Sequence, residues 1–189
     1  MAATWFTADT HFGHASIIRH CRRPYADARA MDAALAAAWN AVVQSDDEVW
    51  HLGDFAFRSA QDAAAYLRRL NGRVHLVWGN HDTPQTRADP AWASSQPMAE
   101  VVVDGQALVL CHYAMRVWPG SHRGALHLFG HSHASLPGDA QSCDVGVDVP
   151  AFRYRPASLA DIRRHLAQQP ARAAPDHHGR TGRGGGHGR

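Results

Sequence analysis

Five short stretches of the sequence carry the side chains that most often bind divalent metal ions. Each follows an apolar run, and together they supply carboxylate oxygens, imidazole nitrogens and an amide oxygen. They are Asp9-Thr10-His11, Gly53-Asp54, Gly79-Asn80-His81-Asp82, His112 and Gly130-His131-Ser132-His133. This mixed nitrogen and oxygen set suits two hard or borderline divalent cations. Five such stretches in this order, each at the end of a predicted strand, indicate a two-metal hydrolase that acts on phosphate esters.

The spacing within these stretches fits a shared site. Residues i and i+2 at the end of a strand point to the same side, so Asp9 and His11 can reach one ion together. Asp54 lies just beyond its strand, where one carboxylate can bridge two cations with its two oxygens. The amide oxygen of Asn80 can bind a metal without adding negative charge. Two Asp residues against two divalent ions then leave positive charge for a phosphate group.

His81 follows a candidate ligand and can lie beside the metal centre without joining it. There its imidazole is a candidate general acid for the departing oxygen. Asp82 is a candidate to hold that ring in the useful tautomer. Gly-Asp and Asn-His-Asp are also common turn sequences, so the joint pattern of five strand ends, and no single residue, favours catalysis.

Charge is unevenly distributed along the chain of 189 residues. Residues 170–189 hold four Arg and one Asp, or +3, whereas residues 1–169 hold fifteen Arg and sixteen acidic residues, or −1. The nearly neutral body shows no basic stripe of the kind that follows a nucleic-acid backbone.

The cysteines and the N-terminus predict a cytoplasmic protein. Three Cys, an odd number with no CxxC spacing, favour reduced thiols over a disulfide framework. Residues 1–20 lack a secretory pattern, and no stretch approaches the length of a membrane span. The sequence indicates no particular oligomeric state.

Apolar runs alternate with helical spacing in the first half of the chain, which is typical of α/β layering. Strands are expected at Thr4–Ala8, Glu48–Leu52 and Arg73–Trp78, and helices at Asp27–Val43 and Ser59–Leu70.

The second half predicts more strands and one more helix. Val101–Val103 and Ala107–Cys111 flank Asp104-Gly105, a strong hairpin signal. Further strands are expected at Ala125–Phe129 and Cys143–Val147, and a capping box that starts at Ser158 opens a last helix. We expect one domain over residues 1–169 and a disordered Gly/Arg/His-rich tail over 170–189.

The motif order D-x-H, G-D, G-N-H-D, H and G-H-x-H resembles the calcineurin-like metallophosphoesterase superfamily. The stretches Thr7–His14, Arg22-Arg23-Pro24 and His51–Phe55 are similar to a group of small bacterial and phage phosphoesterases within it. The resemblance covers roughly Thr4 to Leu166. It implies an α/β fold in which two mixed sheets pack face to face as a β-sandwich flanked by helices, in αββα layers.

The resemblance also implies a ligand set and a reaction. One metal would be held by Asp9, His11, Asp54 and His133, and the second by Asp54, Asn80, His112 and His131. A hydroxide between the ions would attack phosphorus in line, and His81 would assist the departing group. Mn²⁺ is the expected metal, with Fe, Zn or Ni as alternatives.

Substrate contacts are expected from residues outside the ligand set, namely His14, Arg23, Arg116, Trp118 and His122. The last three lie in the segment Tyr113–Arg123, which either stacks a base and grips a phosphate or forms a lid that excludes water.

Three functions follow, in order of preference. The first is a phosphatase or phosphodiesterase that acts on small molecules or nucleotides. The second is a nuclease or nucleic-acid end-processing phosphodiesterase, which the nearly neutral body disfavours. The third is a non-catalytic scaffold, which the complete motif set disfavours.

Overall fold

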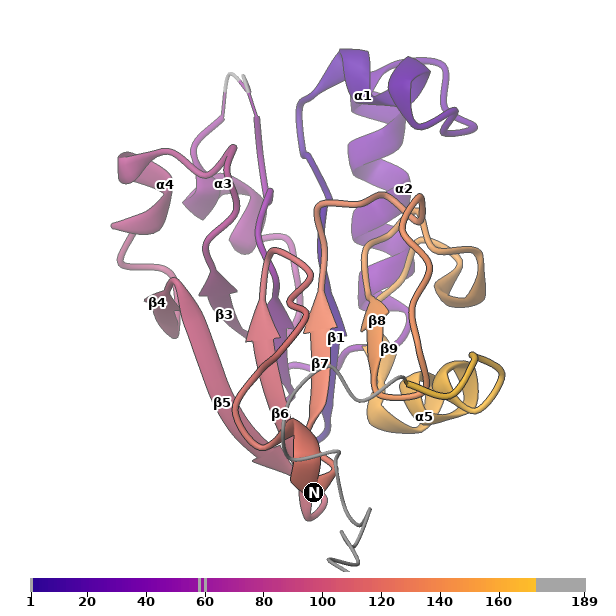
Figure 1. The fold of residues 1–189 in the computed structure, drawn as a ribbon. Helices are drawn as coiled ribbons and strands as arrows, with labels where there is room; N and C mark the ends of the chain where they lie inside the picture. The colour runs from indigo at the N-terminus through magenta and orange to yellow at the C-terminus, as the bar shows by residue number, and fades with distance from the viewer. Residues whose placement is uncertain (1, 58, 60, 173–189) are drawn as a thin grey trace, which may run out of the picture.

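The computed structural model describes residues 2–57, 59 and 61–172, which form two mixed sheets with flanking helices (Figure 1). This arrangement confirms the expected α/β two-sheet fold. The first sheet has the strand order β4-β3-β2-β1-β9, and the second has the order β5-β6-β7-β8. The first comprises β1 (Thr4–Thr7), β2 (Glu48–His51), β3 (Arg73–Val77), β4 (Ser94–Gln96) and β9 (Ala157–Ser158), and the second comprises β5 (Met98–Val103), β6 (Gln106–Cys111), β7 (Leu126–Phe129) and β8 (Ser142–Asp144).

Most strands run parallel, and this sets the position of the predicted ligands. β1, β2, β3 and β4 are parallel neighbours in one sheet, and β6, β7 and β8 are parallel neighbours in the other. The arrowheads of β3, β6 and β7 point to the same end of the molecule (Figure 1). Loops that follow parallel strands meet at the carboxyl ends of those strands, where α/β proteins bind ligands.

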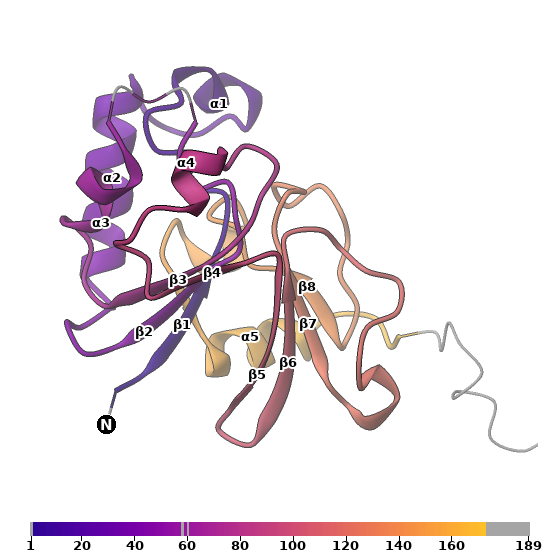
Figure 2. The same ribbon diagram turned by 90° about the vertical axis from the view of Figure 1, so that its left-hand side faces the viewer.

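The helices cover the first sheet and one edge of the sandwich. Helices α2 (Ala28–Asn40) and α3 (Ala63–Leu67) lie on the outer face of the first sheet, as Figure 2 shows. On α2, Met31, Leu35 and Trp39 are buried in a cluster that includes strand residues of that sheet. Burial of such an apolar stripe stabilises a helix more than its intrinsic propensity does.

The last helix, α5 (Leu159–Leu166), joins the core between the sheets. Leu159, Ile162 and Leu166 pack in the same buried cluster as Phe6 of β1 and Leu128 of β7. The predicted capping box is present, because the side chains of Ser158 and Asp161 each accept a backbone N–H from the other residue.

Several short elements have no counterpart among the predicted ones. They are α1 (Ala15–His20), α4 (Pro84–Arg87), β4, η1 (Ser121–Arg123), η2 (Pro150–Phe152) and β9. Each spans six residues or fewer, too few for a helical or alternating pattern to emerge.

The chain stays packed on the body to the end of the described residues. The carbonyl of Pro170 accepts a hydrogen bond from Ala140 N–H, and Arg172 lies over the ring of Trp118 at 3.7 Å. The domain boundary at 169 stays a prediction, as does the disordered tail over 170–189, of which residues 173–189 lie outside the described residues. Among the residues that the structure describes, no helix is long and apolar enough to cross a membrane.

His51, the last residue of β2, is fully buried in this core. Its Nε2 lies 3.0 Å from the hydroxyl of Thr10, and its ring stacks on Trp39. Burial lowers the pKa of His51 to about 3, so the ring is neutral at pH 7.

We expect acid to destabilise the fold through His51. The unfolded chain binds a proton near the usual pKa of 6.5, whereas the folded ring binds one only near pH 3, so stability falls as pH falls below 6.5. Between pH 7 and pH 5 the wild type should lose about 2 kcal/mol more free energy of unfolding than His51→Gln. Urea denaturation followed by circular dichroism measures both. Equal losses in the two proteins would contradict the prediction.

Candidate metal centre

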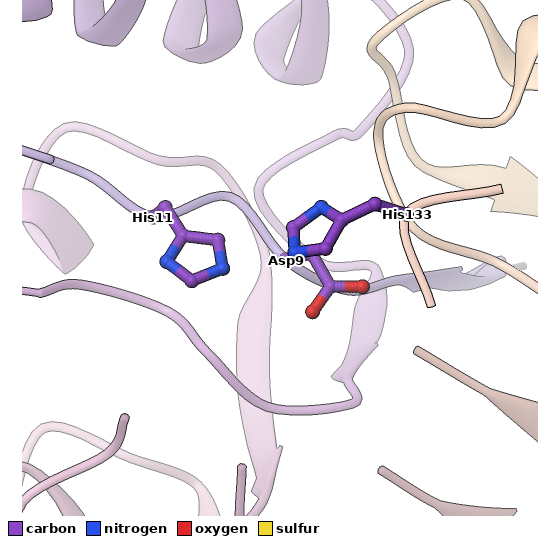
Figure 3. Close-up of side chains that lie close together, drawn as sticks. All are labelled: Asp9, His11 and His133. Carbon is purple, nitrogen blue, oxygen red and sulfur yellow. The ribbon is translucent and has the colours of Figure 1, made fainter. Parts of the chain in front are cut away.

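Two groups of potential metal ligands lie at the carboxyl ends of the parallel strands. Asp9, His11 and His133 form the first group, and Asp54, His112 and His131 form the second. Within each group the ligand atoms lie within 4.8 Å of one another. Figure 3 shows the first group, in which two residues that follow β1 meet a histidine from the loop after β7.

Asp54 belongs to the second group and also faces the first. Its Oδ2 is 3.5 Å from Nε2 of His11 and 3.6 Å from Nε2 of His112. Its Oδ1 accepts the backbone N–H of His81 at 2.8 Å. One oxygen therefore faces both groups while the other anchors the neighbouring loop, in contrast to the expectation that both oxygens face cations.

Asn80 completes the second group. Its Oδ1 lies 3.0 Å from Nε2 of His112 and 3.0 Å from Nδ1 of His131. The other nitrogen of His112, Nδ1, donates to the carbonyl of Leu52 at 2.7 Å, so the free electron pair of the neutral form of this ring is on Nε2. Two electron-pair donors then face each other, an arrangement that a cation stabilises.

The first group has the same electronic character. Nε2 of His11 is buried and has no hydrogen-bond partner, and burial holds the pKa of His11 well below its usual range. Burial also raises the pKa of the Asp9 carboxyl, which is completely shielded from solvent. A neutral imidazole with a free electron pair beside a buried carboxyl group fits a divalent cation.

His133 carries more proton affinity than its neighbours. Burial disfavours the charged ring, but hydrogen bonds with Asp148 and Cys21 and the charge of Asp9 outweigh it and raise the pKa of His133 to about 10. Negative charge that attracts a proton to this ring also attracts a metal ion.

The backbone is left-handed at five of the seven candidate ligands, which is uncommon for residues other than glycine. The φ angles are 58° at Asp9, 51° at His11, 57° at Asp54, 67° at His131 and 46° at His133. Such residues cost about 1–3 kcal/mol each and cluster at functional sites. Each turns the chain sharply after its strand and directs a side chain into the centre.

Two glycines allow the loops to approach the Asp54 carboxylate. Gly53 has φ +89°, and a Cβ there would lie 2.7 Å from Nδ1 of His112. A Cβ on Gly79 would overlap the carboxylate and the backbone nitrogen of Asp54. Both positions therefore require glycine.

His81 lies at the open side of the centre. Its side chain is 34% exposed, and its Nε2 is 3.9 Å from Oδ2 of Asp54. Its ring packs on Phe57, with the ring centres 4.2 Å apart. The ring is thus fixed on one face and accessible to a substrate from solvent.

Asp82 does not hold the ring of His81, which corrects the predicted tautomer role. Its carboxylate is buried and accepts three backbone N–H groups, from Asp54 at 2.9 Å, Phe55 at 3.0 Å and Gly79 at 2.8 Å. Burial raises the pKa of Asp82, and these hydrogen bonds act against that shift. Asp82 joins the loops after β2 and β3.

Three of the predicted substrate residues are not placed to contact a substrate at the centre. Arg23 is buried, with its donors engaged by protein acceptors. Trp118 is buried and donates from Nε1 to the carbonyl of Ala125. His122 lies in η1, directly before β7, and so at the opposite end of that strand from His131. These positions leave none of the three to contact a substrate at the centre.

Of the other two, His14 lies beside the centre, whereas a substrate contact by Arg116 stays a prediction. His14 lies beside His11, with their Nδ1 atoms 3.3 Å apart. Arg116 lies in an exposed turn, where its carbonyl accepts a hydrogen bond from Arg172.

Tyr113, which the sequence singles out only as the first residue of the 113–123 segment, also borders the centre. The half-exposed ring of Tyr113 lies 4.7 Å from that of His131, and its hydroxyl is 3.4 Å from Oδ1 of Asn80. Its position directly after His112 is the sequence signal that could have identified it.

Comparison with known proteins gives a family and several relatives. Residues 5–146 match the sequence profile of the calcineurin-like phosphoesterase superfamily domain. An uncharacterized protein of Methanocaldococcus jannaschii is 29% identical over 168 residues, which are 84% of this chain and 88% of the archaeal protein. The gene 66 protein of Mycobacterium phage D29 is 29% identical over 164 residues, 72% of this chain and 81% of the phage protein. A protein of unknown function from Aquifex aeolicus shares the fold, with a TM-score of 0.66 and 22% identity over 87% of this chain and 100% of that one.

We expect Asp82→Ala to lower the free energy of unfolding by about 3 kcal/mol, because it leaves three buried N–H groups without an acceptor. The matched control is Asp27→Ala, which removes a carboxylate that caps α2 by accepting only Ala30 N–H and should cost about 1 kcal/mol. Urea denaturation measures both. Similar losses in the two variants would show that Asp82 is no more than an ordinary cap.

Proposed function

Because the chain belongs to the calcineurin-like phosphoesterase superfamily, and is therefore a metal-dependent phosphoric ester hydrolase, we propose that it hydrolyses phosphomonoesters or phosphodiesters at a two-cation centre. The proposed substrates are small molecules or nucleotides. The observation that carries this proposal is the position of Asp54 Oδ2, which lies 3.5 Å from Nε2 of His11 in the first group and 3.6 Å from Nε2 of His112 in its own group.

The proposed ligands divide between the two cations. The first cation is held by Asp9, His11, Asp54 and His133, and the second by Asp54, Asn80, His112 and His131. Their nitrogen and oxygen atoms suit Mn²⁺, with Fe, Zn or Ni as alternatives. Divalent cations bound there supply Lewis-acid stabilisation of phosphoryl oxygens and lower the pKa of water.

His81 is the proposed general acid. Its backbone N–H is anchored to Oδ1 of Asp54, and its ring rests on Phe57, so its position relative to the ligands is fixed. Its exposed edge can give a proton to the departing oxygen of a substrate bound beside Asp54.

Tyr113 and His14 are proposed to contact the rest of the substrate. Tyr113 borders the second ligand group and His14 borders His11 of the first group. A phosphate at the centre would place its ester substituent near the hydroxyl of Tyr113 and the ring of His14, whose two nitrogens already face His11 and Ser16. Hydrogen bonds from such groups select substrates by shape and polarity.

Purified protein reloaded with Mn²⁺ should hydrolyse an aryl phosphomonoester or phosphodiester. His81→Ala should lower kcat about 10²- to 10⁴-fold, because it removes the general acid. Asp54→Asn should also greatly lower kcat by weakening both cation sites. The exposed His20→Ala, on α1, is the matched control and should leave the rate unchanged.

The same assay should include linear and cyclic diesters, nucleotides, and single-stranded DNA and RNA. Cleavage confined to the polynucleotides, and weakening with added salt, would favour the nuclease alternative. Absence of turnover on the whole panel with Mn²⁺, Fe²⁺, Zn²⁺ and Ni²⁺ would refute the proposal.

A further inference from the structure

Arg23 and Asp148 form a buried ion pair beside the first ligand group. Nε of Arg23 donates to Oδ1 of Asp148 at 2.8 Å, and Nη2 donates to Oδ2 at 2.8 Å. The side chain of Arg23 is completely buried and that of Asp148 is 6% exposed. Such a two-pronged contact fixes the plane of the carboxylate as well as its distance.

Asp148 in turn holds His133. Its Oδ2 accepts a hydrogen bond from Nδ1 of His133 at 2.7 Å. A proton held at Nδ1 leaves Nε2 as the nitrogen that can bind a cation together with Asp9 and His11. Carboxylates commonly orient metal-binding histidines in this way.

Arg23 also holds the backbone at the start of the first group. Nη2 donates to the carbonyl of Asp9 at 2.6 Å, and Nη1 donates to the carbonyl of Thr10 at 2.9 Å. These bonds lie at the left-handed residue that turns the Asp9 carboxylate into the centre. One guanidinium therefore connects Asp9 with Asp148, and through Asp148 with His133.

The ion pair of Arg23 with Asp148 contacts the first ligand group and not the second. None of the hydrogen bonds described for Arg23 or Asp148 goes to Asp54, His112 or His131. Cys21 also lies near His133 and Asp148. However, Arg23 occupies both oxygens of Asp148, so these three residues are poorly suited to a third cation.

We propose that Arg23 and Asp148 are positioning residues for the first cation: they fix the tautomer and orientation of His133 and the backbone turn at Asp9. This inference rests on the proposed two-cation centre. It predicts that loss of the pair weakens the first cation site and leaves the second intact.

The test is a Mn²⁺ titration of metal-free protein by calorimetry, with bound metal measured after gel filtration. The wild type should bind two Mn²⁺ per chain. Asp148→Ala should weaken one site about 10- to 100-fold and leave the other unchanged. Asp161→Ala is the matched control, because Asp161 also pairs with arginines but lies on α5, and it should retain both sites.

Asp148→Ala leaves the charge of Arg23 buried without a partner, so this variant could fail to fold, which circular dichroism would detect. A second variant avoids this problem. Arg23→Met combined with Asp148→Leu leaves no unpaired buried charge and should lose the same single site. Independently, ¹⁵N NMR of Zn²⁺-loaded wild type, with the His133 signals assigned from His133→Gln, should show a proton on Nδ1 of His133 and metal on Nε2.

The outcomes separate this inference from the proposed function. A wild type that binds fewer than two Mn²⁺ would refute the two-cation centre. If the wild type binds two, the positioning role is overturned by any of three results: folded variants that keep both affinities, folded variants that weaken both sites equally, or metal on Nδ1 of His133.

Discussion

Buried negative charge at the ends of β1 and β2 is the constraint on which the centre depends. The carboxylates of Asp9 and Asp54 are almost fully removed from water, and the imidazoles that face them include rings whose burial favours the neutral form. Arg23 does not neutralise them, because its guanidinium is committed to Asp148 and to backbone carbonyls. A proton on His133, whose pKa is raised to about 10, offsets part of this charge. A metal ion can take the place of that proton, so the arrangement favours cations here.

The fold holds these carboxylates in place through hydrogen bonds between loops. Parallel strands bring the loops to one end of the sandwich, and hydrogen bonds to carboxylates then fix them to one another. Asp82 joins the loops after β2 and β3, and the N–H of His131 donates to Asp9 across the two sheets at 2.9 Å. The same residue types thus serve two purposes: some carboxylates face the centre, while others hold the backbone that presents them.

The sequence predicted the part of the site that strand ends determine. An apolar run that stops at a polar residue can be recognised in the sequence alone. All seven candidate ligands follow such runs: Asp9, His11, Asp54, Asn80, His112, His131 and His133. The ion pair of Arg23 with Asp148 joins residues 125 positions apart and leaves no local pattern. The substrate contacts predicted for the segment after His112 were only partly right for a related reason. The segment connects the end of β6 with the start of β7 at the opposite end of the sheet, so Tyr113 borders the centre while Trp118 and His122 do not. Asp82 was misplaced because adjacency in sequence does not determine which way a turn directs a side chain.

The left-handed backbone at five of the candidate ligands limits how this centre can be reused. Copying the side chains onto strand ends of another scaffold would reproduce the composition of the centre but not its geometry, because a residue with negative φ would direct its side chain elsewhere. A designer would have to transfer whole loops together with their anchors, Gly53, Gly79, Asp82 and Arg23. The smallest part of this centre that could be transferred to another protein is therefore the set of hydrogen-bonded turns, because its seven candidate side chains alone are insufficient.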